Sequence, residues 1–313
     1  MFKLSADHHF SIGHEHVTGG KPCQDHALSM FDDTMACAVI SDGCSTAGET
    51  DMGARVLTFG AVAAIRAYHA RHEENAFLSD ANEYGVITEV SAQQRIVLGT
   101  VRHALGLARN DMLATCGYAF ATREGAVIHL DGDGVITTKF RDGSLSMNRF
   151  NWARAPFYPQ YREESGGAGY MREYEDLLTP ALTEECWSFN LSTKDYVLDV
   201  TTTHTVTDGM RGITKSLSKE ELTDDIDSIA VFTDGVFRVD STDWKDVVVD
   251  LMAFKTTEGV FAKRRMIRAL KDFRAKGKGP MDDIAYAVIH VKPEPIEKGD
   301  IHGNPNQDPQ GST

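Results

Sequence analysis

Six Asp-Gly dipeptides punctuate this 313-residue chain, and they begin at positions 42, 131, 133, 142, 208 and 234. Asp-Gly is one of the strongest short signals for a tight turn between antiparallel strands, because both residues tolerate the backbone conformation that such a turn requires. Short apolar runs flank the central dipeptides, at residues 126–130 and 135–140. The sequence therefore predicts antiparallel sheets that are rich in hairpins.

Other segments have the periodicity of helices. Apolar residues recur every three or four positions over residues 50–72 and 91–113, which predicts two long amphipathic helices, and two more are expected at about 243–253 and 259–276. Further strands are expected at residues 35–40, 117–121, 187–200, 229–233 and 284–291. We expect one α/β (α+β) domain over residues 1–291, in which two antiparallel β-sheets pack as a sandwich flanked by helices.

Composition restricts the partners and the compartment. The net charge of −14 argues against nucleic acid and against an anionic membrane surface, because both attract clustered Lys and Arg. The five cysteines are dispersed without a Cys-x-x-Cys pair, which is typical of reduced thiols in a cytoplasmic protein. The first residues are too polar for a signal peptide, and no apolar run reaches membrane-spanning length. Residues 292–313 contain four prolines and few large apolar side chains, and we expect a disordered tail there.

Four aspartates lie at the edges of apolar, strand-like runs. Asp42 and Asp234 end such runs, whereas Asp25 and Asp282 precede them. If the fold collects these edges at one end of the sandwich, four carboxylates meet and need protons or cations to offset their repulsion. All-oxygen ligands suit Mg²⁺ or Mn²⁺, and two such ions about 4 Å apart can clamp a phosphoryl group. The residues alone leave open the alternative that each Asp-Gly pair is only a turn.

Five motifs occur in order along the chain: CQDHA, AVISDGCSTAGETDMGARV, LDGDGVI, IAVFTDGVF and MDDIAYAVI. Together they span roughly residues 10–291 and resemble the motifs of the metal-dependent protein serine/threonine phosphatases of type 2C (the PPM family), in particular a bacterial branch whose first motif contains Cys-Gln-Asp. The resemblance implies hydrolysis of phosphoserine or phosphothreonine in proteins by a hydroxide that bridges two Mn²⁺ or Mg²⁺ ions. It also implies a phosphorylated protein substrate and an opposing Ser/Thr kinase.

The resemblance also implies roles for individual residues. Asp42 is expected to bridge the two ions, and the carbonyl of Gly43 to bind one of them. Asp234 and Asp282 are expected to hold the other ion, and Asp25 to bind directly or through water. For Asp133, two interpretations stay open: it helps to bind a third ion, or it only forms a hairpin turn.

Three positions depart from the family pattern. Gln24 stands where many members have Glu, Cys44 replaces a His that often donates a proton, and the usual phosphate-binding Arg before Asp25 is missing. We expect His16 or Lys21 to bind the phosphate, since both lie in the loop before Asp25, and His16 is the candidate catalytic side chain. The alternative for His16 is a loop histidine bonded to the backbone.

These departures keep two other functions open. One is a pseudophosphatase or regulatory binding module that retains the fold with weak or no activity. The other is an enzyme of the same fold that acts on a small phosphorylated metabolite. The aromatic segment 151–174 lies where the family carries a variable flap, and we expect it either to contact the protein substrate or to cap the core.

Overall fold

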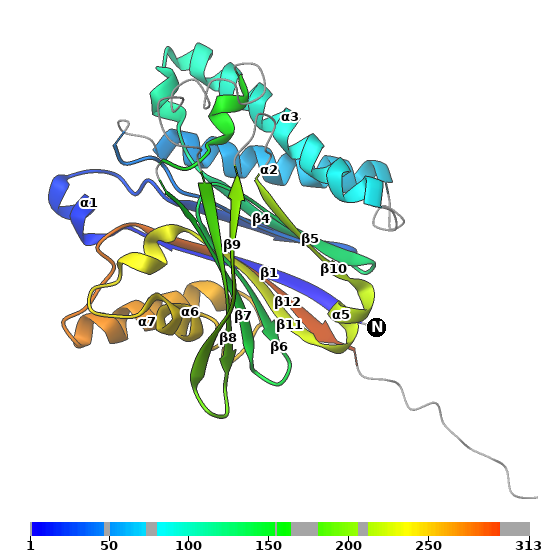
Figure 1. The fold of residues 1–313 in the computed structure, drawn as a ribbon. Helices are drawn as coiled ribbons and strands as arrows, with labels where there is room; N and C mark the ends of the chain where they lie inside the picture. Colours follow the sequence, from blue (N-terminus) through cyan, green and yellow to red (C-terminus); the bar gives the residue numbers. More distant parts are fainter. Residues whose placement is uncertain are drawn as a thin grey trace, which may run out of the picture.

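The computed structural model describes residues 2–46, 51–72, 80–153, 155–163, 181–205 and 212–294. Two antiparallel sheets pack face to face, and a pair of helices covers the outer face of each sheet (Figure 1). The expected sandwich flanked by helices is confirmed.

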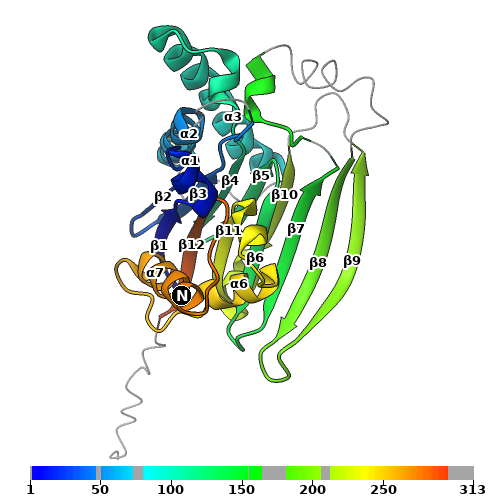
Figure 2. The ribbon, with the colours of Figure 1, turned by 90° about the vertical axis from the view of Figure 1, so that its left-hand side faces the viewer.

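The larger sheet has seven strands, and its order places the first and last strands of the chain side by side. β1 pairs with β12 along its whole length, from Phe2 opposite Pro293 to Ser11 opposite Ile284. Figure 2 shows the β8–β9 hairpin at the opposite edge of this sheet. In spatial order the strands are β1 (Phe2–Ser11), β12 (Ile284–Pro293), β11 (Ile226–Phe232), β6 (Gly134–Phe140), β7 (Leu145–Trp152), β8 (Ala181–Asn190) and β9 (Asp195–Thr205).

The smaller sheet has five strands, and its central strands are buried because helices cover one face and the larger sheet covers the other. This double burial explains why Met35–Ser41 is almost wholly apolar in sequence. In spatial order the strands are β10 (Ile213–Ser218), β5 (Gly125–Asp131), β4 (Cys116–Thr122), β3 (Met35–Ser41) and β2 (His26–Phe31).

Two helix pairs form the outer layers. α2 (Asp51–His72) and α3 (Asp80–Leu105) lie over the five-stranded sheet, and α6 (Trp244–Leu251) and α7 (Phe261–Ala275) over the seven-stranded sheet (Figure 1). Within the described residues, no helix is long and apolar enough to span a membrane. The short helices in the described part of the chain are α1 (His14–Gly19), α5 (Lys219–Asp224) and the 3₁₀-helices η2 (Arg109–Met112), η3 (Pro159–Glu163) and η5 (Asp234–Arg238).

Three expected elements are corrected by the structure. The helix expected at 91–113 is α3, which begins at Asp80 and ends at Leu105, because Gly106 has a left-handed φ of 66° and stops it. The strand expected at 187–200 is two strands, since Asn190 accepts hydrogen bonds from the next backbone N–H groups and turns the chain into β9. The loop expected before Asp25 contains helix α1.

The Asp-Gly dipeptides make fewer hairpins than the sequence predicts. Asp142-Gly143 closes the β6–β7 hairpin, but residues 131–134 carry the chain from one sheet to the other. Asp42 and Asp234 follow the ends of β3 and β11, and the dipeptide at 208 lies outside the described residues. β12 continues to Pro293, so residues 292 and 293 belong to the sheet and not to the expected tail; residues 295–313 lie outside the described part.

Candidate active site

The strand register brings the ends of several strands to one end of the sandwich. His26 pairs with Ser41, which places Asp25 beside Asp42. Phe232 pairs with both Tyr286 and Val135, so the residues after β11 lie beside those that precede β12 and β6. The aspartates gathered at this end, called the aspartate cluster below, are Asp25, Asp42, Asp133, Asp234 and Asp282.

Burial raises the pKa values of four aspartates in this cluster, and repulsion between neighbouring carboxylates adds to the effect for Asp25, Asp42 and Asp234. Burial raises the pKa of Asp25 to about 7 and that of Asp133 to about 6. The pKa values of Asp42 and Asp234 lie well above the ordinary range, first because of burial and second because of the neighbouring carboxylates. The carboxyl groups of Asp25 and Asp42 also share a hydrogen bond. The cluster therefore holds protons at a pH at which exposed aspartates are ionised.

Thr233 fixes the orientation of Asp25. Its hydroxyl donates to Asp25 Oδ2 over 2.7 Å and accepts from the backbone N–H of Ala285 over 2.9 Å. Because Thr233 is the last residue before Asp234 and is fully buried, it links Asp25 to the loop that carries Asp234.

The donor set of the cluster fits a hard divalent cation. In the described part of the chain, no three His, Cys, Asp or Glu side chains are already arranged as the ligands of one ion. The cluster nevertheless offers only carboxylate oxygens, and burial, followed by repulsion between neighbouring carboxylates, disfavours the charged forms of Asp42 and Asp234. A divalent cation offsets that repulsion as protons do, and oxygen ligands are those that Mg²⁺ and Mn²⁺ prefer.

Two glycines let the backbone segments of the site approach closely. A Cβ atom on Gly235 would lie 1.8 Å from the carbonyl oxygen of Asp283, and one on Gly13 would lie 2.1 Å from the carbonyl carbon of Asp282. No side chain fits at either position without a backbone shift. The two glycines therefore allow the Asp234 loop and the start of α1 to pack directly against the backbone of the Asp282–Asp283 segment.

His16 is buried and held by a carboxylate that the sequence analysis did not single out. Its Nδ1 lies 2.7 Å from Asp283 Oδ2, and its Nε2 lies 3.9 Å from Asp282 Oδ1. Asp283 also accepts hydrogen bonds from the backbone N–H groups of Gly13 (2.7 Å) and Gln24 (2.5 Å). An ionised carboxylate only accepts hydrogen bonds, so Nδ1 carries the proton and Nε2 faces Asp282. The alternative of a histidine bonded to the backbone is wrong.

The other expected residues lie around the loop that follows Asp42. Lys21 is exposed, and its Nζ donates to the carbonyl of Ser45 over 3.3 Å, which places it beside this loop. The backbone N–H of Gly43 donates to the carbonyl of Gln24, whose side chain is buried. Cys44 is half-buried and shares a hydrogen bond with the hydroxyl of Tyr158.

The described part of the aromatic segment caps the core. Trp152, Phe157, Tyr158 and Tyr161 are buried between the sheets, and the indole N–H of Trp152 donates to the carbonyl of Gly132 over 2.8 Å. The expectation that the segment caps the core is confirmed for these side chains, and contact with a protein substrate stays a prediction. Residues 164–174 lie outside the described part.

A buried ion pair anchors this segment next to the aspartate cluster. The guanidinium of Arg162 binds both carboxylate oxygens of Asp131, one of them over 2.7 Å, and His129 Nε2 lies 3.4 Å from the same carboxylate. Burial alone opposes ionisation, but Arg162 and His129 lower the pKa of Asp131 to about 2. Asp131 is thus a charged structural group, two residues from Asp133, whose pKa burial raises.

Sequence reasoning missed Thr233, Asp283, Tyr158 and Arg162. Asp283 had a signal, because it directly follows Asp282 and precedes a buried strand, where a carboxylate needs a partner. The contacts of Tyr158 and Arg162 join segments more than 30 residues apart, and no local pattern encodes them.

Comparisons with known proteins agree with this architecture. The sequence model of the protein phosphatase 2C family matches residues 12–273. A serine-threonine phosphatase 2C from Toxoplasma gondii has 12% sequence identity and a TM-score of 0.51, with 93% of this chain and 95% of that chain covered. The serine/threonine phosphatase Stp1 from Staphylococcus aureus has 11% identity, a TM-score of 0.49 and coverage of 92% and 95%, respectively. A search of the curated proteins found no match.

Proposed function

Because this chain belongs to the protein phosphatase 2C family, we propose that it hydrolyses phosphoserine and phosphothreonine in proteins, with Mn²⁺ or Mg²⁺ held by the aspartate cluster. The observation that carries the proposal is the meeting of five aspartates from distant segments at one end of the sandwich, with raised pKa values where burial and repulsion act. Such a cluster has no evident role in stability, since its members repel one another.

We assign the ligands by residue. Asp42 interacts electrostatically with both Asp25 and Asp234, which supports the role of a ligand shared by two ions. The carbonyl of the next residue, Gly43, is a proposed ligand of one of them. Asp234 and Asp282 interact with each other and are the proposed ligands of one ion. Asp133 interacts with Asp42 and Asp234, which supports a further ligand at a third ion.

When bound, the divalent ions supply positive charge to the phosphoryl oxygens and to the water that attacks phosphorus. The chain adds two groups. His16 Nε2 faces the cluster, and Asp283 holds the ring by accepting from Nδ1. In its doubly protonated form the imidazolium carries a second proton on Nε2, and this is the proposed proton donor to the leaving serine or threonine oxygen. Lys21, on the exposed loop beside Ser45, is the proposed contact for phosphate oxygens.

The proposed substrate is a phosphorylated protein, and the proposed biological counterpart is a Ser/Thr kinase. The family match supports a protein substrate. We keep the cytoplasm as the proposed compartment, on the strength of the dispersed cysteines.

Phosphate release from a phosphothreonine peptide tests the proposal. The wild-type chain should release phosphate with Mn²⁺ or Mg²⁺, and excess EDTA or Asp234→Asn should reduce the rate at least 100-fold. Asp142→Asn is the matched control, because Asp142 is an exposed Asp of an Asp-Gly turn outside the cluster. If the folded wild-type chain releases no phosphate with any divalent metal, the proposal fails. Hydrolysis of small phosphorylated metabolites alone would contradict the protein substrate.

A further inference from the structure

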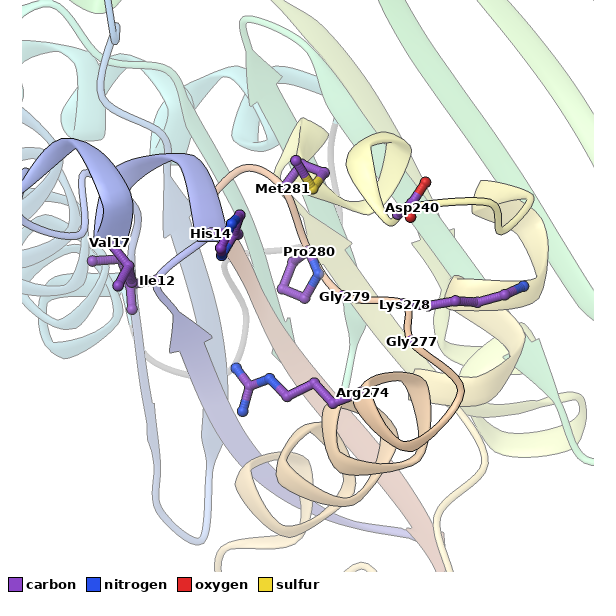
Figure 3. A pocket seen from close by; sticks show the side chains of 10 residues that line it. All are labelled: Ile12, His14, Val17, Asp240, Arg274, Gly277, Lys278, Gly279, Pro280 and Met281. Carbon is purple, nitrogen blue, oxygen red and sulfur yellow. The ribbon is translucent and has the colours of Figure 1, made fainter.

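A cavity of about 470 Å³ lies behind the segment that carries Asp282. Figure 3 shows that Arg274 at the end of α7 and His14 at the start of α1 both point into it, with Met281 on its wall. Lys278 and Asp240 also line the cavity. The proposed mechanism of phosphate hydrolysis uses none of these side chains.

The cavity lies at the end of the most basic segment of an acidic protein. Residues 263–278 contain eight Lys or Arg and one Asp, whereas the whole chain has a net charge of −14. In the structure, α7 carries most of these cations, and Arg274 in its last turn lines the cavity (Figure 3).

Two cations that line the cavity, Lys278 and Arg274, differ in their hydrogen bonds. Lys278 Nζ donates to the carbonyl of Ser241 over 2.6 Å and lies 3.4 Å from Thr242 Oγ1, so it is fixed in the wall. Arg274 is exposed, and its guanidinium makes no hydrogen bond or ion pair with the described residues. Asp240 contributes one carboxylate to the lining. Its side chain is bonded to Ser241 Oγ, over 3.1 Å.

Two segments separate the cavity from the aspartate cluster: helix α1 and the segment that leads into Asp282. The backbone N–H of His14 donates to Pro280 O and that of Glu15 to Met281 O, both over 2.9 Å, so α1 is fastened to the segment that leads into Asp282. His14 and His16 are two residues apart, about 200° around the helix, so one faces the cavity and the other faces Asp282. A helix with its side chains is about 10 Å across, and an extended peptide advances about 3.3 Å per residue, so a few residues suffice to cross the ridge that α1 forms.

We propose that this cavity binds an acidic side chain of the protein substrate, a few residues from the phosphorylated serine or threonine. Arg274 provides a planar fork of donors that matches a carboxylate, and His14 adds a donor on the same side of the cavity. The inference rests on the proposed function, and it names a substrate class: phosphoproteins with Asp or Glu near the phosphorylated residue.

Paired peptides test the inference. Two phosphothreonine peptides differ only in having Glu or Gln on both flanks, and p-nitrophenyl phosphate serves as a substrate without flanks. The wild-type chain should have a KM about 5- to 10-fold lower for the Glu peptide, and Arg274→Ala should remove this preference with kcat unchanged. Arg274→Glu should reverse the preference. Arg268→Ala is the matched control, because Arg268 is an exposed cation of α7 outside the cavity, and it should change KM less than twofold.

A binding measurement separates this inference from the proposed function. A fluorescein-labelled Glu-rich peptide without phosphate should bind the wild-type chain, measured by anisotropy at 50 mM salt, and its affinity should fall about 5- to 10-fold in Arg274→Ala. This readout needs no turnover. Equal effects of Arg268→Ala and Arg274→Ala would show diffuse attraction and overturn the inference, as would unchanged binding in Arg274→Glu. A loss of p-nitrophenyl phosphate turnover in Arg274→Ala that equals its loss of peptide turnover would also overturn it.

Discussion

Asp25→Asn removes one charge from the aspartate cluster and keeps the size of the side chain. Asp25 is almost fully buried, and the hydroxyl of Thr233 can donate to the Asn oxygen as it does to Asp25 Oδ2. We therefore expect the metal-free variant to be more stable than the wild-type chain at neutral pH. This is an unusual outcome, because most substitutions of buried, hydrogen-bonded residues destabilise a protein.

The magnitude follows from the pKa of Asp25, which is about 7 in the folded chain against an ordinary value of 3.8. Between these two values the folded state binds more protons than the unfolded state, so the free energy of unfolding falls as the pH rises. The fall is at most about 1.4 kcal/mol per pH unit and ends above pH 7. From pH 5 to pH 8 the wild-type chain should therefore lose roughly 2 to 3 kcal/mol that Asp25→Asn keeps.

Urea unfolding in EDTA at pH 5 and pH 8 measures this difference. The stability advantage of Asp25→Asn over the wild-type chain should grow by roughly 2 to 3 kcal/mol between the two pH values. Relief of repulsion on Asp42 acts in the same direction. Asp142→Asn should show no such growth, because Asp142 is fully exposed and its pKa is lowered by hydrogen bonds from Ser144. Mn²⁺ at about 100 times its Kd should add about 2.7 kcal/mol to the wild-type chain and less to Asp25→Asn.

A pH-independent difference between Asp25→Asn and the wild-type chain would refute this reasoning. It would mean that Asp25 is ionised at pH 5 in the folded chain, and that repulsion within the cluster is too weak to require a cation.

Three further substitutions test other contacts. Gly235→Ala puts a methyl group 1.8 Å from the carbonyl oxygen of Asp283, so we expect a loss of about 1 to 3 kcal/mol in urea unfolding and loss of stabilisation by Mn²⁺. Arg162→Met leaves the charge of Asp131 buried without its partner and should cost about 3 to 5 kcal/mol at pH 7. This loss should shrink as the pH falls below about 4, because the stability from a lowered pKa disappears as the wild-type carboxylate is protonated near its pKa of about 2. Asp283→Asn weakens the hold on His16 and should lower kcat about 10- to 100-fold and shift its pH profile, measured with a phosphothreonine peptide.

Each of these three predictions has an outcome that would contradict it. Normal Mn²⁺ stabilisation of Gly235→Ala would show that the close approach does not position the cluster. A destabilisation by Arg162→Met that does not change between pH 7 and pH 3.5 would show that lost packing, and not the unpaired carboxylate, causes it. An Asp283→Asn variant with a normal kcat and pH profile would remove His16 from the proposed chemistry.

The elements with a strong local pattern could be predicted from the sequence. The uninterrupted apolar run at residues 35–40 and the runs before Asp234 and after Asp282 predict β3, β11 and β12, because strands covered on both faces need apolar side chains throughout. The aspartates at the strand edges were found for the same reason, since the polarity changes abruptly there.

The rest depends on contacts between distant segments. Helix α1 is six residues long and is fastened by hydrogen bonds to residues 280 and 281, so its own sequence gives little signal. The dipeptides at 131 and 133 predict a hairpin between β5 and β6. In the structure, β5 lies in the five-stranded sheet and β6 in the seven-stranded sheet, because tertiary packing decides which strands pair. The role of Arg162 becomes visible only when its partner Asp131 is in place, 31 residues away in the sequence.

A crystal soaked in Mn²⁺ and measured for anomalous scattering tests the central claim most directly. We expect two strong anomalous peaks among Asp25, Asp42, Asp234 and Asp282, about 4 Å apart, with Asp42 bound to both ions. A soaked, well-ordered crystal with no anomalous peak at the aspartate cluster would contradict it.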